Sequence, residues 1–257
     1  VDRGYGAWAD KAAGSLEEVV VAVIDSGVDA SNPDLSPVMW DKGLTTEGLA
    51  TTGKEDKHGF AAAAGSAAGV TSHTGITSYH GTHVAGTIGA AWDDEGVSGL
   101  APNARIMAVR HNDTLAGMLQ CFDYVSRACD AGVDVRVSNN SWGFGQGMWR
   151  SVDLAVTEIG QQGVVSVFAS GNSAFDNDAA ASTATTLADN PYAIVVNAVD
   201  PTGERSSFTQ YGETTTDVMA PGSGILSTWA TGEPNYLGEE DADAVLYESF
   251  DAESHAA

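Results

Sequence analysis

One apolar run constrains the fold of this chain more than any other feature. Residues 19–24 read Val-Val-Val-Ala-Val-Ile, and Asp25, a serine and a glycine follow directly. A continuous run rich in β-branched residues is typical of a strand that is buried on both faces, as in parallel sheets. Such a strand delivers Asp25 at its carboxyl end, the edge at which α/β proteins place their active sites. His80 lies at the head of a segment of small residues, and an aspartate and a histidine are two of the three groups of a nucleophile-activating triad.

Further apolar runs alternate with helical patterns along the chain. We expect strands at 19–24, 104–109, 133–138, 164–169 and 194–199, and helices at 83–91, 115–131 and 151–161. This alternation predicts an α/β fold with a central parallel sheet flanked by helices. Ser151 is expected to cap the third helix, and Gly163 lies just past its end.

Two segments have the composition of insertions. Residues 41–79 are rich in Gly, Thr, Ser and Ala, which predicts a surface loop with short strands. Residues 231–246 are acidic. A solvated loop and a cation-binding or substrate-excluding lid are both open for this second segment.

The charge balance excludes two classes of partner. The 257 residues include 35 acidic and 11 basic ones, a net charge of −24. Nucleic acid and anionic membranes would be repelled, because binding their phosphates takes clustered Lys and Arg. Solubility, adaptation to high salt and the binding of divalent cations are all open explanations of this acidity.

No apolar stretch is long enough for a membrane span. No signal peptide begins at Val1, which leaves a mature form or a cytoplasmic protein.

The two cysteines are not expected to form a disulfide. Cys121 and Cys129 fall in the same predicted helix. Eight residues of helix span about 12 Å, which is too far for an S–S bond. We expect two buried thiols.

Five motifs, in order, resemble those of the subtilisin family of serine proteases. Residues 21–29 resemble its aspartate motif, 80–87 (HGTHVAGT) its histidine motif, 140–143 its substrate strand, 170–172 its oxyanion asparagine, and 218–222 the segment that leads to its serine. The similarity covers the chain from about residue 19 to its end. It implies a three-layer subtilisin-like fold, a single peptidase domain over 1–257, and a serine endopeptidase that works through an acyl-enzyme.

The resemblance also implies roles for individual residues. His80 would be the general base, Asp25 would orient it, and Asn172 would donate to the oxyanion. The edge that pairs with substrate backbone would be made by Ser141, Trp142 and Gly143, although Trp142 can equally be a core aromatic. His83, one helical turn beyond His80, is expected to be structural, and a metal site on this His-x-x-His pair is the alternative.

The nucleophile motif is where the chain departs from the family. The family's Gly-Thr-Ser-Met-Ala string is absent, and an alignment without gaps puts Ser254 on the nucleophile, preceded by Ala252 and Glu253. The negative charge of Glu253 would destabilise an oxyanion that develops beside it. Ser249 and a serine beyond Ala257 are the competitors for this role. The chain is expected to be truncated just after this motif, without the C-terminal helix region, so a non-catalytic peptide-binding pseudoprotease or an inactive fragment is the alternative function.

A structural calcium ion is implied by the same resemblance. The family holds it between an acidic residue after the aspartate motif and a loop after the histidine helix. The ligands here would be the side chains of Asp34 and Asp93 and the carbonyls of Ala91, Glu95 and Val97. A solvated acidic loop is the alternative.

The resemblance also implies the setting in which the chain works. Protein or peptide substrates and a prodomain are the partners it suggests, with no nucleic acid and no membrane span. A monomer is expected, in a secreted or extracellular location.

Overall fold

The computed structural model describes residues 17–42, 44, 58–62, 78–143, 150–179, 187 and 189–230, and the backbone of 247–250. The elements are β1 (Val19–Asp25), η1 (Ser36–Val38), β2 (Gly59–Ala61), α2 (Ser78–Gly89), β3 (Ala104–Arg110), α3 (Leu115–Asp130), β4 (Val135–Asn140), α4 (Arg150–Gln161), β5 (Val165–Ala169), β6 (Ala193–Val199), β7 (Val218–Pro221), β8 (Ile225–Thr228) and β9 (Tyr247–Phe250). No helix in this described part combines the length and the apolar character that crossing a membrane requires.

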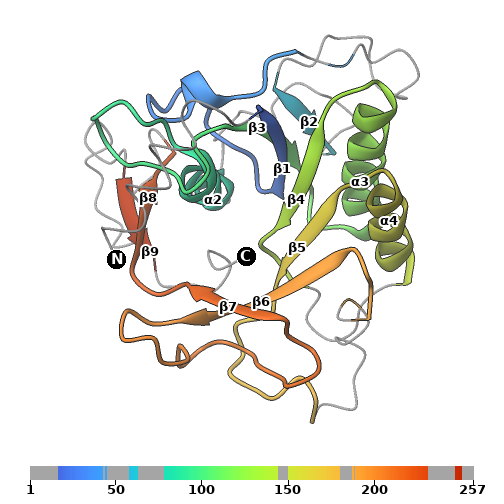
Figure 1. Cartoon of the computed structure of the whole chain (residues 1–257), viewed down its shortest axis with the longest axis vertical. Helices are drawn as coiled ribbons and strands as arrows, with labels where there is room; N and C mark the ends of the chain where they lie inside the picture. Colours follow the sequence, from blue (N-terminus) through green and yellow to red (C-terminus); the bar gives the residue numbers. More distant parts are fainter. Residues whose placement is uncertain are drawn as a thin grey trace.

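A seven-stranded sheet organises the molecule. Its strand order is β2-β3-β1-β4-β5-β6-β7, and every neighbouring pair is parallel. The helix α2 lies on one side of the sheet, and α3 and α4 lie together on the other (Figure 1). This is the three-layer α/β architecture that the sequence predicts. Because the strands run in one direction, their carboxyl ends meet at a single edge.

The central strand is the apolar run with which the sequence argument began. Residues 20–25 of β1 are all buried, and the strand lies between β3 and β4. Valine and isoleucine suit such a position because their branched side chains pack well on a pleated surface covered on both faces. The buried core continues into α3, where Phe122, Tyr124 and Val125 face the sheet.

Most element boundaries lie close to those expected, with three instructive corrections. The strand β4 begins at Val135, because Val133 instead donates its N–H to Ala128 O in the turn that ends α3. The helix α2 begins at Ser78 and stops at Gly89, because the Ala91 N–H bonds to the carbonyl of Asp34 rather than back along the helix. Ser151 is not a cap: α4 starts one residue earlier.

The sequence analysis gave no bounds for the short strands. The strands β2, β7 and β8 have three or four residues each, too few for a periodic pattern. The strand β2 lies within 41–79, which the sequence assigns to a surface loop with short strands. Phe60, Ala61 and Ala62 are nevertheless buried, because β2 pairs with the edge of β3. The acidic segment 231–246 lies outside the described residues.

The two cysteines are free, and they differ in environment. Cys121 is buried in α3, whereas Cys129 near the end of the same helix is partly exposed, so only one of the two expected buried thiols is fully buried. Burial raises the pKa of the Cys121 thiol, which keeps it in its unreactive protonated form.

The strand β8 is fastened to α2 by two hydroxyl groups. Ser227 Oγ donates to His83 O and Thr228 Oγ1 to Thr82 O, each at 2.7 Å. A Cβ added to Gly86 would collide with both hydroxyls. The glycine therefore allows the helix and the strand to approach closely enough for these bonds.

We expect Gly86→Ala to lower the free energy of unfolding by roughly 1–3 kcal/mol, as overpacking does, although alanine is the better helix former by about 1 kcal/mol. Gly89→Ala in the same helix is the matched control, because its Cβ would lie 3.3 Å from the flexible end of Ile106. Thermal unfolding followed by circular dichroism measures both variants. Equal melting temperatures for the two would contradict this account of Gly86.

Candidate active site

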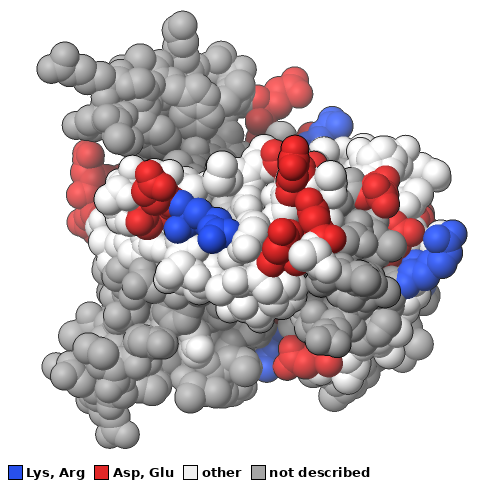
Figure 2. All heavy atoms as spheres, turned by 90° about the horizontal axis from the view of Figure 1, so that it is seen from below, with Lys and Arg blue, Asp and Glu red and all other residues white. Residues whose placement is uncertain are grey.

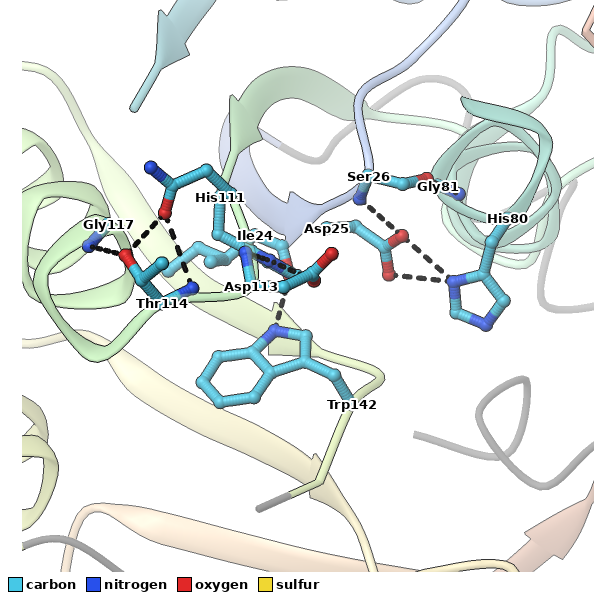
Figure 3. Close-up of polar contacts among 11 residues, drawn as sticks. Ile24, Asp25, Ser26, His80, Gly81, His111, Asp113, Thr114, Gly117 and Trp142 are labelled. Carbon is cyan, nitrogen blue, oxygen red and sulfur yellow. Dashed lines mark hydrogen bonds and ion pairs between the residues drawn. The ribbon is translucent and has the colours of Figure 1, made fainter. Parts of the chain in front are cut away.

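The carboxylate of Asp25 is buried at the carboxyl end of β1. Only 2% of the residue is exposed. The Ser26 N–H donates to its Oδ1 at 2.6 Å (Figure 3). A buried carboxylate is costly unless it is paired and hydrogen-bonded. The first turn of α2 supplies the pairing.

His80 faces Asp25 from that turn. Its Nδ1 lies 2.8 Å from Oδ1 and 3.0 Å from Oδ2 of the carboxylate. Gly81 donates its N–H to Ser26 Oγ at 3.0 Å. A Cβ at Gly81 would collide with Gly27 O. A glycine follows the histidine because no side chain would fit where the helix packs against the loop after β1.

The two groups shift each other's pKa. Burial alone would raise the pKa of Asp25, but the charge of His80, its hydrogen bond and the Ser26 N–H outweigh burial, so this pKa lies below its usual range. Burial alone would lower the pKa of His80, but the charge and hydrogen bond of Asp25 outweigh it and raise this pKa. Because Nδ1 donates to the carboxylate, neutral His80 carries its lone pair on Nε2. The pair is arranged to accept a proton at Nε2.

A cleft of about 320 Å³ opens at this edge of the sheet. Its lining comes from the ends of β1, β3 and β4 and from α2, and consists of Asp25, Ser26, Tyr79, His80, Arg110, His111, Asn112, Asp113, Ser141 and Trp142. Clefts with a few convergent polar groups at such an edge are typical of substrate sites.

Trp142 forms part of this cleft and of the core at the same time. Its Nε1–H donates to Ile24 O at 2.6 Å, and its ring packs edge-on against Phe122 and Phe168. Ser141 is buried and accepts a 2.8 Å hydrogen bond from the Asn139 side chain. Gly143 follows as an exposed residue. The indole thus ties the chain after β4 to the end of β1.

Asn172 lies at the same edge of the sheet, beyond the end of β5. Gly171 precedes it with φ of 113°, and a Cβ at Gly171 would collide with the side chain of Gln210. Asn172 is exposed. It is not among the described residues that line the cleft with His80.

Of the serine candidates, Ser254 lies outside the described residues. Ser249 belongs to β9, where its backbone pairs with Leu226 of β8.

His83 is fully buried, and its ring packs edge-on against Trp229 at 6.2 Å between centroids. It does not share the cleft with His80 among the residues that the structure describes.

The acidic residue after the aspartate motif contacts the loop after α2. Asp34 is 2% exposed. Its Oδ2 accepts the Val97 N–H at 2.8 Å, and its carbonyl accepts the Ala91 N–H at 2.9 Å. Asp94 and Gly96 have φ of 67° and 55°, so the loop curls tightly between these two anchors. No cluster of three or more His, Cys, Asp or Glu side chains that could hold a metal occurs among the described residues.

The sequence analysis missed His111. It directly follows β3, and its N–H donates to Asp25 O at 3.1 Å. The rule that selected Asp25 also applies here, because a polar residue immediately after a predicted parallel strand lies at the active edge of the sheet.

Comparison with known proteins identifies the family. Residues 17–257 match the profile of the subtilase family, Peptidase_S8. The cuticle-degrading protease of Metarhizium anisopliae is 31% identical over 84% of this chain and 48% of its own length. Subtilisin E of Bacillus subtilis is 34% identical over 82% of this chain and 48% of its own length. A crystal structure of a cold-adapted subtilisin-like serine proteinase matches with a TM-score of 0.62 and 25% identity, covering 93% of this chain and 71% of that one.

The chain spans about half the length of these curated relatives. The family profile, however, extends over the sheet, the Asp25–His80 pair and every motif quoted above. The chain belongs to the subtilase family.

Proposed function

We propose that the protein is a serine endopeptidase that hydrolyses peptide bonds through an acyl-enzyme. The observation that carries this proposal is the Asp25–His80 pair, joined at 2.8 Å in a cleft at the carboxyl edge of the sheet. Membership of the subtilase family points the same way. The structure of the pair suits a base that must take a proton from a weak nucleophile near neutral pH.

In the proposed reaction, His80 moves the proton and Asp25 keeps its ring in place. A serine hydroxyl attacks the carbonyl carbon of the scissile bond while its proton passes to Nε2 of His80. The tetrahedral intermediate collapses when the imidazolium gives that proton to the leaving amine. Water then attacks the ester while its proton passes to His80, and His80 returns that proton to the serine oxygen as the acid is released.

The remaining roles are carried over from the motifs. Ser254 is the proposed nucleophile, supported by its gap-free alignment with the family's serine. Asn172 is the proposed oxyanion donor, supported by its position after β5, one strand beyond β4. The chain after β4, at 141–143, is the proposed edge for substrate backbone, supported by the cleft that Ser141 and Trp142 line.

Treatment with a fluorophosphonate is expected to inactivate the protein and to place one adduct on Ser254. Peptide mass spectrometry locates the adduct. His80→Ala is the control and should slow labelling on the order of 10²–10⁴-fold, the usual contribution of a general base. An adduct on another serine would remove Ser254 from its role. Peptide binding without labelling or hydrolysis would favour the non-catalytic alternative.

The pH profile tests the charge coupling. His80 must be neutral to act, and its pKa is raised, so kcat/KM for a peptide anilide should fall on acidification already above about pH 6.5. Asp25→Asn removes the charge and leaves burial, which lowers the pKa of His80. The fall of kcat/KM on acidification should then occur below about pH 6.5. At the same time kcat should fall roughly 10⁴-fold, a size known for other serine proteases. A fall of kcat/KM at an unchanged pH would contradict the coupling.

A structural calcium ion at Asp34 is part of the proposal. The Asp34 carboxylate is buried, and within the described residues no Lys, Arg or His is ion-paired with it. In the same part of the chain, no backbone N–H is bonded to the carbonyls of Ala91, Glu95 or Val97. Oxygen atoms of these kinds are the ligands that calcium prefers, and they fit the ion. Asp34 and Asp93 would add carboxylates, and the ion would compensate the buried charge.

Calcium should raise the melting temperature, and a chelator should reverse the rise. Calcium that binds only the folded state adds about 2.7 kcal/mol to the free energy of unfolding when its free concentration is a hundred times Kd. Asp93→Ala should reduce this shift. Asp94→Asn removes one negative charge from the same loop and is the matched control, because asparagine tolerates the φ of 67° found there. Equal loss of the shift in both variants would indicate general charge screening instead of a site.

An extracellular location is proposed with the calcium site. Calcium sites of extracellular modules have Kd values of about 10⁻⁴–10⁻³ M, so they depend on the higher calcium concentrations outside cells. The net charge of −24 agrees with a highly soluble protein that several cations can accompany.

A further inference from the structure

A carboxylate at the rim of the cleft has no part in the chemistry described so far. Asp113 lines the cleft together with Asp25 and His80, and 81% of its side chain is exposed. Its φ of 57° lies in the left-handed region, which aspartate tolerates better than most residues. A charged and accessible group is therefore held beside the reacting groups.

His111 holds the backbone of Asp113 in place. The Asp113 N–H donates to His111 Nδ1 at 3.3 Å, and Asp113 Oδ1 lies 3.1 Å from the same nitrogen (Figure 3). The His111 side chain is only 8% exposed, and its ring packs edge-on against Trp142 at 5.5 Å between centroids. Because the backbone of His111 is also bonded to Asp25, the position of Asp113 is tied to the catalytic strand.

The other side of the turn is equally fixed. Asn112 Oδ1 accepts hydrogen bonds from both the N–H and the hydroxyl of Thr114. Thr114 in turn caps α3 by accepting the Gly117 N–H at 3.0 Å. Asp113 lies between these two anchors, so the backbone that carries its carboxylate is held at the rim of the cleft.

We propose that Asp113, whose backbone is held by His111, is a specificity-determining residue that binds a cationic side chain of the polypeptide substrate at the rim of the cleft. This inference rests on the proposed peptidase function and names its substrate class. The charge of the whole chain acts in the same direction, because a net charge of −24 attracts cationic peptides and repels anionic ones. Figure 2 shows Asp and Glu side chains at several places on one face of the molecule.

Arg110 is the residue that would produce the opposite preference. It ends β3 and lines the same cleft, but it is partly buried, whereas Asp113 is exposed at the rim. A substrate side chain therefore reaches Asp113 first. A preference for acidic side chains that disappears in Arg110→Gln would assign the selection to Arg110.

Protonation of His111 should weaken the site. Burial lowers the pKa of His111, assisted by His80 of α2 and Arg110 of β3 and opposed by Asp25 of β1 and Asp113 of its own turn. Neutral His111 can accept the Asp113 N–H and leaves the carboxylate to the substrate. The imidazolium instead donates Nδ1–H to that carboxylate, which then competes with the substrate cation. Because its pKa is lowered, this change occurs below about pH 6.5.

Matched peptides test the proposal. Internally quenched alanine peptides carry either lysine or norleucine, which has the same carbon chain without the ammonium, at each of the three positions before the cleaved bond. At one position the kcat/KM ratio of lysine to norleucine should be about three- to five-fold, as for a partly exposed ion pair, and 0.5 M NaCl should reduce it. Asp113→Asn, which keeps the left-handed backbone accessible, should bring the ratio to about one. A ratio unchanged in Asp113→Asn would overturn the proposal.

Two further arms separate the possible failures. Binding of fluorescent lysine and norleucine peptides to His80→Ala, measured by anisotropy, needs no catalysis. If the preference appears there while the wild-type protein hydrolyses nothing, the proposed function fails and the role of Asp113 stands. In the wild-type protein the ratio should decline from pH 7.5 to pH 5.5, and in His111→Asn it should stay level. A level ratio in the wild type would remove His111 from the proposal.

Discussion

The structure depends on one hydrogen bond between two elements that are distant in the chain. His80 Nδ1 must lie within 3 Å of a carboxylate buried at the end of β1, so the first turn of α2 has to contact the loop after that strand. Gly81 makes this contact sterically possible, and Ser26 secures it by accepting the Gly81 N–H. The surrounding strands supply the rigidity, because β1 is held between β3 and β4 and cannot shift alone.

The helix α2 connects the reacting groups to the rest of the molecule. Its first turn carries His80, its middle is bonded to β8 through Ser227 and Thr228, and the chain after its end returns to Asp34. These contacts belong to three separate segments of sequence. A change in the loop at 91–97 or in β8 can therefore displace His80 without touching it, and the proposed catalysis would be sensitive to displacements of this kind.

Burial and charge act against each other throughout the cleft. Burial disfavours the charged forms of Asp25, His80 and His111, and in the first two the mutual attraction of carboxylate and imidazole is stronger. In His111 burial prevails, so its pKa is lowered. Two histidines beside one aspartate thus have opposite shifts in pKa, since only His80 makes a direct hydrogen bond to that carboxylate.

Much of the fold could be predicted from local patterns. The apolar runs that became β1, β3 and β6 are largely buried on both faces, so their composition by itself marks them as strands of a parallel sheet. The run that became β5 was also assigned as a strand, although its burial alternates and Val165 is exposed. The motif at 80–87 indicated the helix and the histidine, although α2 begins five residues before the expected start. Short strands such as β2 and β7 could not be located, because three or four residues show no period and pair only when a neighbouring edge is present.

The sequence by itself determined the fold class, the family and the order in which Asp25, His80 and Asn172 occur. It could not determine which side chains share the cleft. Trp142 lies beneath the ends of the strands because its indole bonds to Ile24 O, and His111 lies beside Asp25 because β3 and β1 are paired in register. Both contacts join residues that are far apart in the chain, and only the folded sheet brings them together.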